Sequence, residues 1–296
     1  MLTAARRAFS NSLLEQAASA STWKDRLSIR SSSPRQRSVI AAFRWVAGVL
    51  PAAFGCRVTW GGRCGVGCHG VTPDERWLAA VWPFVRAWLP GLPAVVLEIG
   101  CGPLGGFVPM LRSAGYEAAG VDPEAPEGPW YHRVEFERYE VPDPAVAVVA
   151  CTSLHHVADV GEVLDAARAA LAAGGTLVVV EWARERFDEA TARWCFNRLP
   201  PPSESPGWLQ QRCDGWRASG LPWDGYCRAW AEEESLHAGQ DIVRELDTRF
   251  NRQLLATGPY FFPDLANVSE NEEQAAIDAG EIQANRIAHV CQRRQA

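Results

Sequence analysis

Residues 95–106 read VVLEIGCGPLGG, an apolar run that carries one acid, Glu98, and leads directly into a glycine-rich turn. The apolar run predicts a buried strand over 94–100, because strands of a parallel sheet are apolar on both faces. Glycines in the turn permit backbone conformations that other residues avoid and let the backbone approach a ligand closely. The stretch therefore predicts a strand followed by a ligand-binding loop.

The pattern continues on both sides of this turn. A helix is expected over 72–91, capped by Thr72 with Glu75 in a capping box, and Pro83 should kink or restart it. Further helices are expected over 105–115 and 159–175, and further strands over 117–123, 131–136, 145–153 and 176–182. Alternating apolar strands and helices predict an α/β fold, a mainly parallel sheet covered by helices on both faces.

The pattern changes after Trp182. We expect a helix over 186–199, a breaker-rich stretch over 200–207, a tryptophan-rich segment and a helix that ends near Phe250. Short strands over 258–265 and 287–294 should flank a helical stretch over 269–281. The predicted organisation is an N-terminal extension over 1–70 and one domain over 71–296, divided into a core over 90–185, a helical and aromatic insertion over 186–255 and C-terminal strands over 256–296.

The first 70 residues are basic, rich in serine and poor in acids. Their one apolar run, Val39–Phe54, is shorter than the ~20 residues that a membrane-spanning helix needs. Composition favours a disordered extension, with a transit peptide or a signal anchor as the alternatives.

Charge and cysteine content restrict the class of protein. A formal net charge of -6 argues against nucleic acid or an anionic membrane as partner and favours a small molecule. Nine cysteines, without the spacing of a small disulfide scaffold, favour a reducing cytoplasm. The spacing of Cys56, Cys64, Cys68 and His69 departs from that of structural zinc sites, so no metal is expected there.

The turn itself matches the GxGxxG pattern of dinucleotide sites over Gly100–Gly105, and Asp122 follows about 20 residues after Gly102, where an acid would bind a ribose. Glu98 argues against a dinucleotide, because a carboxylate gains nothing beside a phosphate. A ligand with an ammonium group suits it better. S-adenosylmethionine has an ammonium group and a ribose, and it has no phosphate.

Four stretches, VLEIGCGPLGGF, GVDPE, VVACTSLHHV and LAAGGTLVVVEW, together resemble in order and spacing the successive motifs of class I S-adenosylmethionine-dependent methyltransferases. The resemblance covers roughly residues 94–183. The tail from 258 to 287 also resembles the ending of a bacterial small-molecule branch of that superfamily. The resemblance implies a Rossmann-like, mainly parallel seven-stranded sheet with helices on both faces and a helical insertion.

The resemblance also implies which residues bind S-adenosylmethionine. The methionine end would lie against Glu98, Gly100 and Gly102, Cys101 would also bind the cofactor, and Asp122 would hold the ribose. Glu137 would lie near the adenine, with Glu135 and Glu140 as competitors, and Cys151 and Thr152 would flank the cofactor. Val146 departs from the pattern, since many relatives have Asp early in the fourth strand.

His155 or His156 is the candidate catalytic base, because both follow the fourth strand at the edge where ligands bind; the alternative is that they only pack. Glu181, Trp182 and Tyr260 are the candidate substrate-lining residues, with Glu181 alternatively a structural partner and the aromatic residues alternatively core. The expected function is methyl transfer to a small-molecule O, N or C atom by a cytoplasmic monomer or homodimer. The alternatives are a regulatory or scaffold protein that binds the cofactor without catalysis, or a nicotinamide-dependent oxidoreductase.

Overall fold

The computed structural model describes residues 71–201 and 206–294. Contacts within the chain divide it between Glu75 and Arg76, and the unit that begins at Arg76 carries the sheet and its helices. The predicted basic extension and the group Cys56, Cys64, Cys68 and His69 lie outside the described residues.

One seven-stranded sheet forms the centre of this unit, with the strand order β3-β2-β1-β4-β5-β7-β6. The first five strands are parallel, and β7 runs antiparallel to both β5 and β6. This confirms the predicted α/β class and the mainly parallel sheet. The strands are β1 (Val95–Ile99), β2 (Glu117–Val121), β3 (Tyr131–His132), β4 (Ala145–Cys151), β5 (Leu171–Trp182), β6 (Phe250–Gly258) and β7 (Arg286–Arg293).

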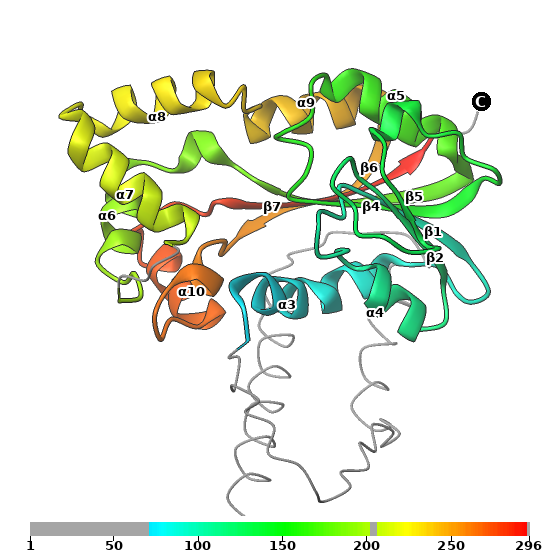
Figure 1. Ribbon diagram of the computed structural model, residues 1–296, viewed down its shortest axis with the longest axis horizontal. Helices are drawn as coiled ribbons and strands as arrows, with labels where there is room; N and C mark the ends of the chain where they lie inside the picture. The colour runs from blue at the N-terminus through cyan, green and yellow to red at the C-terminus, as the bar shows by residue number, and fades with distance from the viewer. Residues whose placement is uncertain (1–70, 202–205, 295–296) are drawn as a thin grey trace, which may run out of the picture. The chain divides into compact units, whose positions relative to one another are not determined.

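Helices cover both faces of the sheet (Figure 1). On one face α3 (Pro73–Trp88) and α4 (Val108–Ser113) pack residues such as Val85 and Leu111 against the sheet. On the other face α5 (Val160–Ala170) and α9 (Gly239–Arg249) contribute Leu164 and Leu246. The buried strand side chains on the two faces explain why the strands are apolar throughout.

The insertion forms a third apolar cluster beyond the end of β5. Its helices are α6 (Glu189–Phe196), α7 (Trp208–Ser219) and α8 (Trp223–Glu233), and α10 (Glu270–Asp278) follows β6. Trp223 is fully buried at its centre and donates its indole N–H to Phe187 O at 2.5 Å. The aromatic residues of this segment therefore provide much of a core.

Several predicted helix ends are confirmed by their capping bonds. Thr72 and Glu75 form the predicted capping box, with Thr72 Oγ1 accepting from Glu75 N at 3.2 Å. Asp159 accepts from Glu162 N at 3.0 Å and begins α5, which ends at Ala170 rather than at the glycine pair, because β5 already starts at Leu171. Helix α3 continues through Pro83 without restarting.

Two predicted strands differ from the structure. The strand over 131–136 ends at His132, because only Tyr131 and His132 pair with β2 and the chain then turns into a 3₁₀-helix at Phe136–Arg138. The prediction of a strand over 258–265 is wrong. The strand is β6, which begins at Phe250 and ends at Gly258, and the following residues form a turn with a 3₁₀-helix at Phe262–Asp264.

Within the described part of the chain, every helix is too short or too polar to cross a lipid bilayer.

Candidate functional site

The predicted site residues come together where β1 lies beside β4. Strand β2 pairs with one edge of β1 and β4 pairs with its other edge. The connections that lead to β2 and to β4 therefore run in opposite directions from this point. Ligands bind at such a switch point, outside the carboxyl ends of the strands. Glu98, Asp122 and Cys151 stand at or just beyond the carboxyl ends of β1, β2 and β4.

Glu98 lies under the glycine loop. Its side chain is 1% exposed, and both carboxylate oxygens accept from Phe107 N, at 3.0 and 2.8 Å. Burial raises the pKa of Glu98 to about 8, against the lowering effect of its bonds to the Phe107 and Val108 backbone. Among the described residues no basic side chain pairs with it. Glu98 is therefore a buried acid that lacks a cation.

The glycines fit this arrangement in two different ways. A side chain at Gly106, where φ is +52°, would collide with the Glu98 carboxyl, so the loop closes over Glu98 only because Gly106 has none. A Cβ at Gly102, where φ is +60°, would meet nothing within 4 Å. The backbone at Gly102 therefore borders open space.

Asp122 holds that part of the loop. Its Oδ2 accepts from Gly102 N at 3.0 Å, and its Oδ1 accepts from Glu124 N at 2.7 Å. The carboxylate is only half-buried. It thus lies beside the open space at Gly102 and keeps lone pairs for further donors.

The loop that follows β4 is bonded to both neighbouring strands, β5 and β1. Thr152 has φ +51° and donates its N–H to Val180 O at 2.7 Å, while Ser153 donates its hydroxyl to Ile99 O at 3.0 Å. Cys151 is buried, and burial raises its thiol pKa to about 12, as burial also does for Cys101. Both thiols stay protonated and act as apolar packing.

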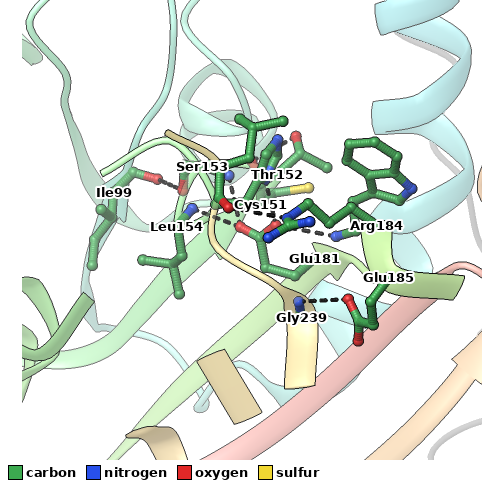
Figure 2. Close-up of polar contacts among 12 residues, drawn as sticks. Ile99, Cys151, Thr152, Ser153, Leu154, Glu181, Arg184, Glu185 and Gly239 are labelled. Atoms are coloured by element: carbon green, nitrogen blue, oxygen red, sulfur yellow. Dashed lines mark hydrogen bonds and ion pairs between the residues drawn. The ribbon is translucent and has the colours of Figure 1, made fainter. Parts of the chain in front are cut away.

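Glu181 is the organising residue of the loop that follows β4 (Figure 2). Its side chain is fully buried at the end of β5. Oε1 accepts from Ser153 N at 2.8 Å and from Leu154 N at 2.6 Å, and Oε2 accepts from Trp182 N at 3.1 Å and contacts His155 Nδ1 at 2.7 Å. Glu181 was expected either to line the substrate site or to be a structural partner, and these contacts are those of a structural partner.

The two candidate histidines differ sharply. His155 is 5% exposed, and His156 is exposed with its ring centroid 4.1 Å from that of His155. Desolvation of the ring and the neighbouring His155 lower the pKa of His156. His155 also accepts at its backbone O from His237 N at 3.0 Å, which attaches the loop to the start of α9.

Trp182 and Tyr260 lie next to the histidines. Trp182 is buried, its ring centroid is 6.0 Å from that of His155 at a nearly perpendicular angle, and it stacks on Tyr260 at 5.9 Å. Trp208 and Trp230 are 5.6 and 5.5 Å from Trp182. We name Trp182, Trp208, Trp230 and Tyr260 the aromatic wall.

Glu273 holds Tyr260 in this wall. The Glu273 side chain is fully buried in α10 and accepts from three successive backbone N–H groups, those of Tyr260, Phe261 and Phe262. From the other side, the Arg76 guanidinium donates to the carbonyl groups of Phe262, Pro263, Leu265 and Val268. Sequence reasoning missed Glu273, because its helix is so acidic that its face reads as solvated.

Glu137 lies in the 3₁₀-helix after β3 and is half-buried, whereas its competitors Glu135 and Glu140 are exposed. Its predicted place near an adenine stays a prediction. Within residues 71–201 and 206–294, no group of three or more His, Cys, Asp or Glu side chains is arranged to hold a metal ion.

Comparison with known proteins gives one family. A family model described as "Methyltransferase domain" matches residues 75–222, half of the chain. Comparison with curated proteins returns no match.

Solved structures with a similar fold have low sequence identity. An S-adenosylmethionine-dependent methyltransferase from Mesorhizobium loti is 18% identical, with a TM-score of 0.45 and coverage of 72% of this chain and 97% of that one. N-methyltransferase NodS from Bradyrhizobium japonicum, bound to S-adenosylhomocysteine, is 14% identical, with a TM-score of 0.42 and coverage of 76% and 89%. Geranyl diphosphate C-methyltransferase from Streptomyces coelicolor is 14% identical, with a TM-score of 0.41 and coverage of 73% and 77%.

Removal of the Glu181 carboxylate should destabilise the protein. Glu181→Ala leaves the buried N–H groups of Ser153, Leu154 and Trp182 without acceptors, and we expect a loss of about 3 kcal/mol or more in the free energy of unfolding by urea. Glu162→Ala, which removes an exposed acid from α5, should change it by less than about 0.5 kcal/mol. Equal effects of the two changes would contradict the role of Glu181.

Glu273 should make stability depend on pH. Burial raises the pKa of Glu273 to about 7, so the folded state holds a proton that the unfolded state has lost between pH 4.5 and about 7. The contribution of Glu273 is therefore fully present below pH 4.5 and is lost as pH rises through 7, with a slope of at most about 1.4 kcal/mol per pH unit.

Urea unfolding at several pH values from about 5 to 8 tests this slope, which Glu273→Gln should reduce. Glu272→Gln is the matched control, because its exposed acid is in the same helix and bonds to Ser269 lower its pKa. A slope unchanged in Glu273→Gln would show that Glu273 does not titrate in this range.

Proposed function

Because the chain belongs to the family of methyltransferase domains and is an S-adenosylmethionine-dependent methyltransferase, we propose that it binds the cofactor across the carboxyl ends of β1, β2 and β4 and methylates a small molecule. Glu98 carries this placement, as a buried acid with no basic partner among the described residues. The ammonium group of the cofactor would supply the missing charge. Family membership removes the nicotinamide alternative.

Each part of the cofactor has a matching feature. The methionine end lies against Gly100, Cys101 and Gly102, and the backbone borders open space at Gly102. Asp122 has free lone pairs for the ribose hydroxyls, and Glu137 is the proposed residue near the adenine. The positive-φ turn at Thr152, next to Cys151, flanks the cofactor on the β4 side.

The acceptor lies toward β5, between the loop after β4 and the aromatic wall. When bound, the cofactor supplies a methyl group on a sulfonium, which is already strongly electrophilic. The protein must therefore exclude water and align the acceptor atom with the carbon–sulfur bond. Trp182 and Tyr260 supply the apolar surface that does both.

We also place the reaction in the cytoplasm. The six cysteines within the described residues are all free thiols, in keeping with a reducing compartment. A small acceptor also fits the acidic net charge, which disfavours nucleic acid and anionic membranes.

Cofactor binding should depend on Asp122 and on the open space at Gly102. Titration calorimetry should show binding of S-adenosylmethionine and S-adenosylhomocysteine but not of NAD. Asp122→Ala should raise both dissociation constants about 10-fold or more, because charged hydrogen bonds to the ribose are lost. Gly102→Ala should weaken binding similarly, since its methyl group would enter the cofactor's space.

Asp143→Ala is the control, since this exposed acid precedes β4 at the opposite edge of the sheet. Circular dichroism should show that all variants are folded. Binding of NAD alone, or unchanged affinity in both Asp122→Ala and Gly102→Ala, would refute the proposed placement.

Cofactor binding should also release a proton from Glu98. With a pKa of about 8, Glu98 is largely protonated at pH 7 in the free protein, and an ammonium group placed beside it favours the charged form. Calorimetry at pH 7 in two buffers of different ionisation enthalpy should therefore show net proton release in the wild type. Glu98→Gln should show less release, and equal proton counts in the two proteins would exclude this pairing.

A further inference from the structure

Glu181 and His155 form a carboxylate–histidine pair at the acceptor side of the site. The contact joins Glu181 Oε2 and His155 Nδ1 at 2.7 Å, and the side chains are 0% and 6% exposed, respectively. A buried pair at this distance is a strong, charge-assisted hydrogen bond when one partner is charged. Figure 2 shows that the carboxyl group of Glu181 is also fixed from the loop side by Ser153 and Leu154.

The surrounding bonds fix which nitrogen of His155 carries the proton. The other three donors to Glu181 are backbone N–H groups, which cannot reverse direction. An ionised Glu181 carboxylate has only acceptors to offer, so Nδ1 must donate to it. Neutral His155 therefore keeps its lone pair on Nε2, and that atom has no hydrogen-bond partner among the described residues. This is the arrangement that a general base requires.

The groups around His155 are mostly aromatic. The ring centroid of Trp182 is 6.0 Å from that of His155, and the ring centroid of His156 is 4.1 Å from it. The titratable groups nearby include Glu181, His156, the Tyr260 phenol and the Cys151 thiol, and Glu234 acts on His156. The buried indole N–H of Trp182 has no hydrogen-bond acceptor among the described residues.

We propose that the acceptor atom is the hydroxyl oxygen of an aromatic molecule, with His155 as the catalytic base and Glu181 as the residue that positions it. This inference rests on the proposed function. In the step, the hydroxyl proton moves to His155 Nε2, and the oxygen electron pair forms the new O–CH₃ bond. The carbon–sulfur bond breaks with its electrons on sulfur, which leaves a neutral thioether, and Glu181 stabilises the imidazolium.

A hydroxyl makes better use of this pair than an amine does. A neutral amine attacks through a lone pair that is already free and loses its proton afterwards. A phenol near neutral pH is a weak nucleophile until its proton is removed, and a positioned base gives about 10²–10⁴-fold in rate. The stacked rings of the aromatic wall match a planar acceptor, because offset and edge-on contacts between rings are favourable.

The acceptor class is tested with matched pairs of small probes. The full-length protein is incubated with labelled S-adenosylmethionine and either phenol, p-cresol or catechol, or the corresponding amines aniline, p-toluidine and o-phenylenediamine. We expect O-methylation of at least one phenol and at least 10-fold lower transfer to its amine. Transfer to amines at equal or higher rates, or to no probe at all while S-adenosylmethionine still binds, would overturn this inference and leave the proposed cofactor site standing. Absence of S-adenosylmethionine binding would instead refute the proposed function.

The role of the pair is tested with two variants that keep its size. In His155→Gln, the amide still donates to Glu181 but offers no base. In Glu181→Gln, the amide group facing Nδ1 favours the other tautomer, with the proton on Nε2. Both should lower kcat for p-cresol about 100-fold or more, with the Kd for S-adenosylmethionine changed less than 3-fold. His289→Gln is the control, because His289 is another buried histidine paired with a carboxylate, that of Asp247, but in β7.

A second methyl acceptor distinguishes a catalytic base at His155 from a histidine that only shapes the site. p-Nitrophenol is already ionised at mildly alkaline pH and needs no base. Its methylation should therefore fall less than about 5-fold in His155→Gln under conditions in which that of p-cresol falls about 100-fold. An equal loss for both acceptors would show that His155 only shapes the site, and equal loss in His289→Gln would show a general effect on folding.

Discussion

The carboxyl group of Glu181 joins the parts of the structure on which the acceptor side depends. It stands at the carboxyl end of β5, accepts two backbone N–H groups from the loop after β4, and contacts His155 from the same loop. Thr152, which enters that loop with positive φ, is itself bonded to Val180 on β5. The direction of His155 is thus fixed by the register between β4 and β5 rather than by the loop alone.

A buried acid that accepts hydrogen bonds from the backbone of a loop also occurs at two other places around the site. Glu98 fixes the glycine loop through Phe107 N, and Glu273 fixes the turn that carries Tyr260 through three successive N–H groups. Each loop would otherwise leave backbone donors buried without partners, which is costly. A buried carboxylate satisfies several of them at once, but burial raises the pKa of Glu98 and of Glu273. Glu98 and Glu273 are therefore acids whose ionised form a nearby positive charge would stabilise.

The local structure of the proposed cofactor side follows from the sequence more directly than that of the proposed acceptor side. The glycine turn, Asp122 and the ends of β1, β2 and β4 depend on local sequence, because strand patterns and glycines act over a few residues. Arg76 acts from 186–192 residues away, and Glu273 from 11–13 residues away in the next helix, on a turn whose sequence resembles an aromatic strand. The aromatic residues and prolines of GPYFFPDL are compatible with a strand or with a turn. The hydrogen bonds to Glu273 in α10 and from Arg76 in α3 stabilise the turn.

The division between the two sides has a consequence for how the protein selects its acceptor. The proposed cofactor residues lie along β1, β2 and β4, whereas the aromatic wall comes from the end of β5, the insertion helices and the turn after β6. Trp182 is the only member of the wall that lies in the sheet, and it also contacts His155. Substitutions at Trp208 or Trp230 can therefore reshape the surface of the proposed acceptor site while His155 and the glycine loop keep their positions. Since both tryptophans are half-buried and border solvent, the cost to folding of such changes is smaller than at Trp223, which fills the centre of the third core.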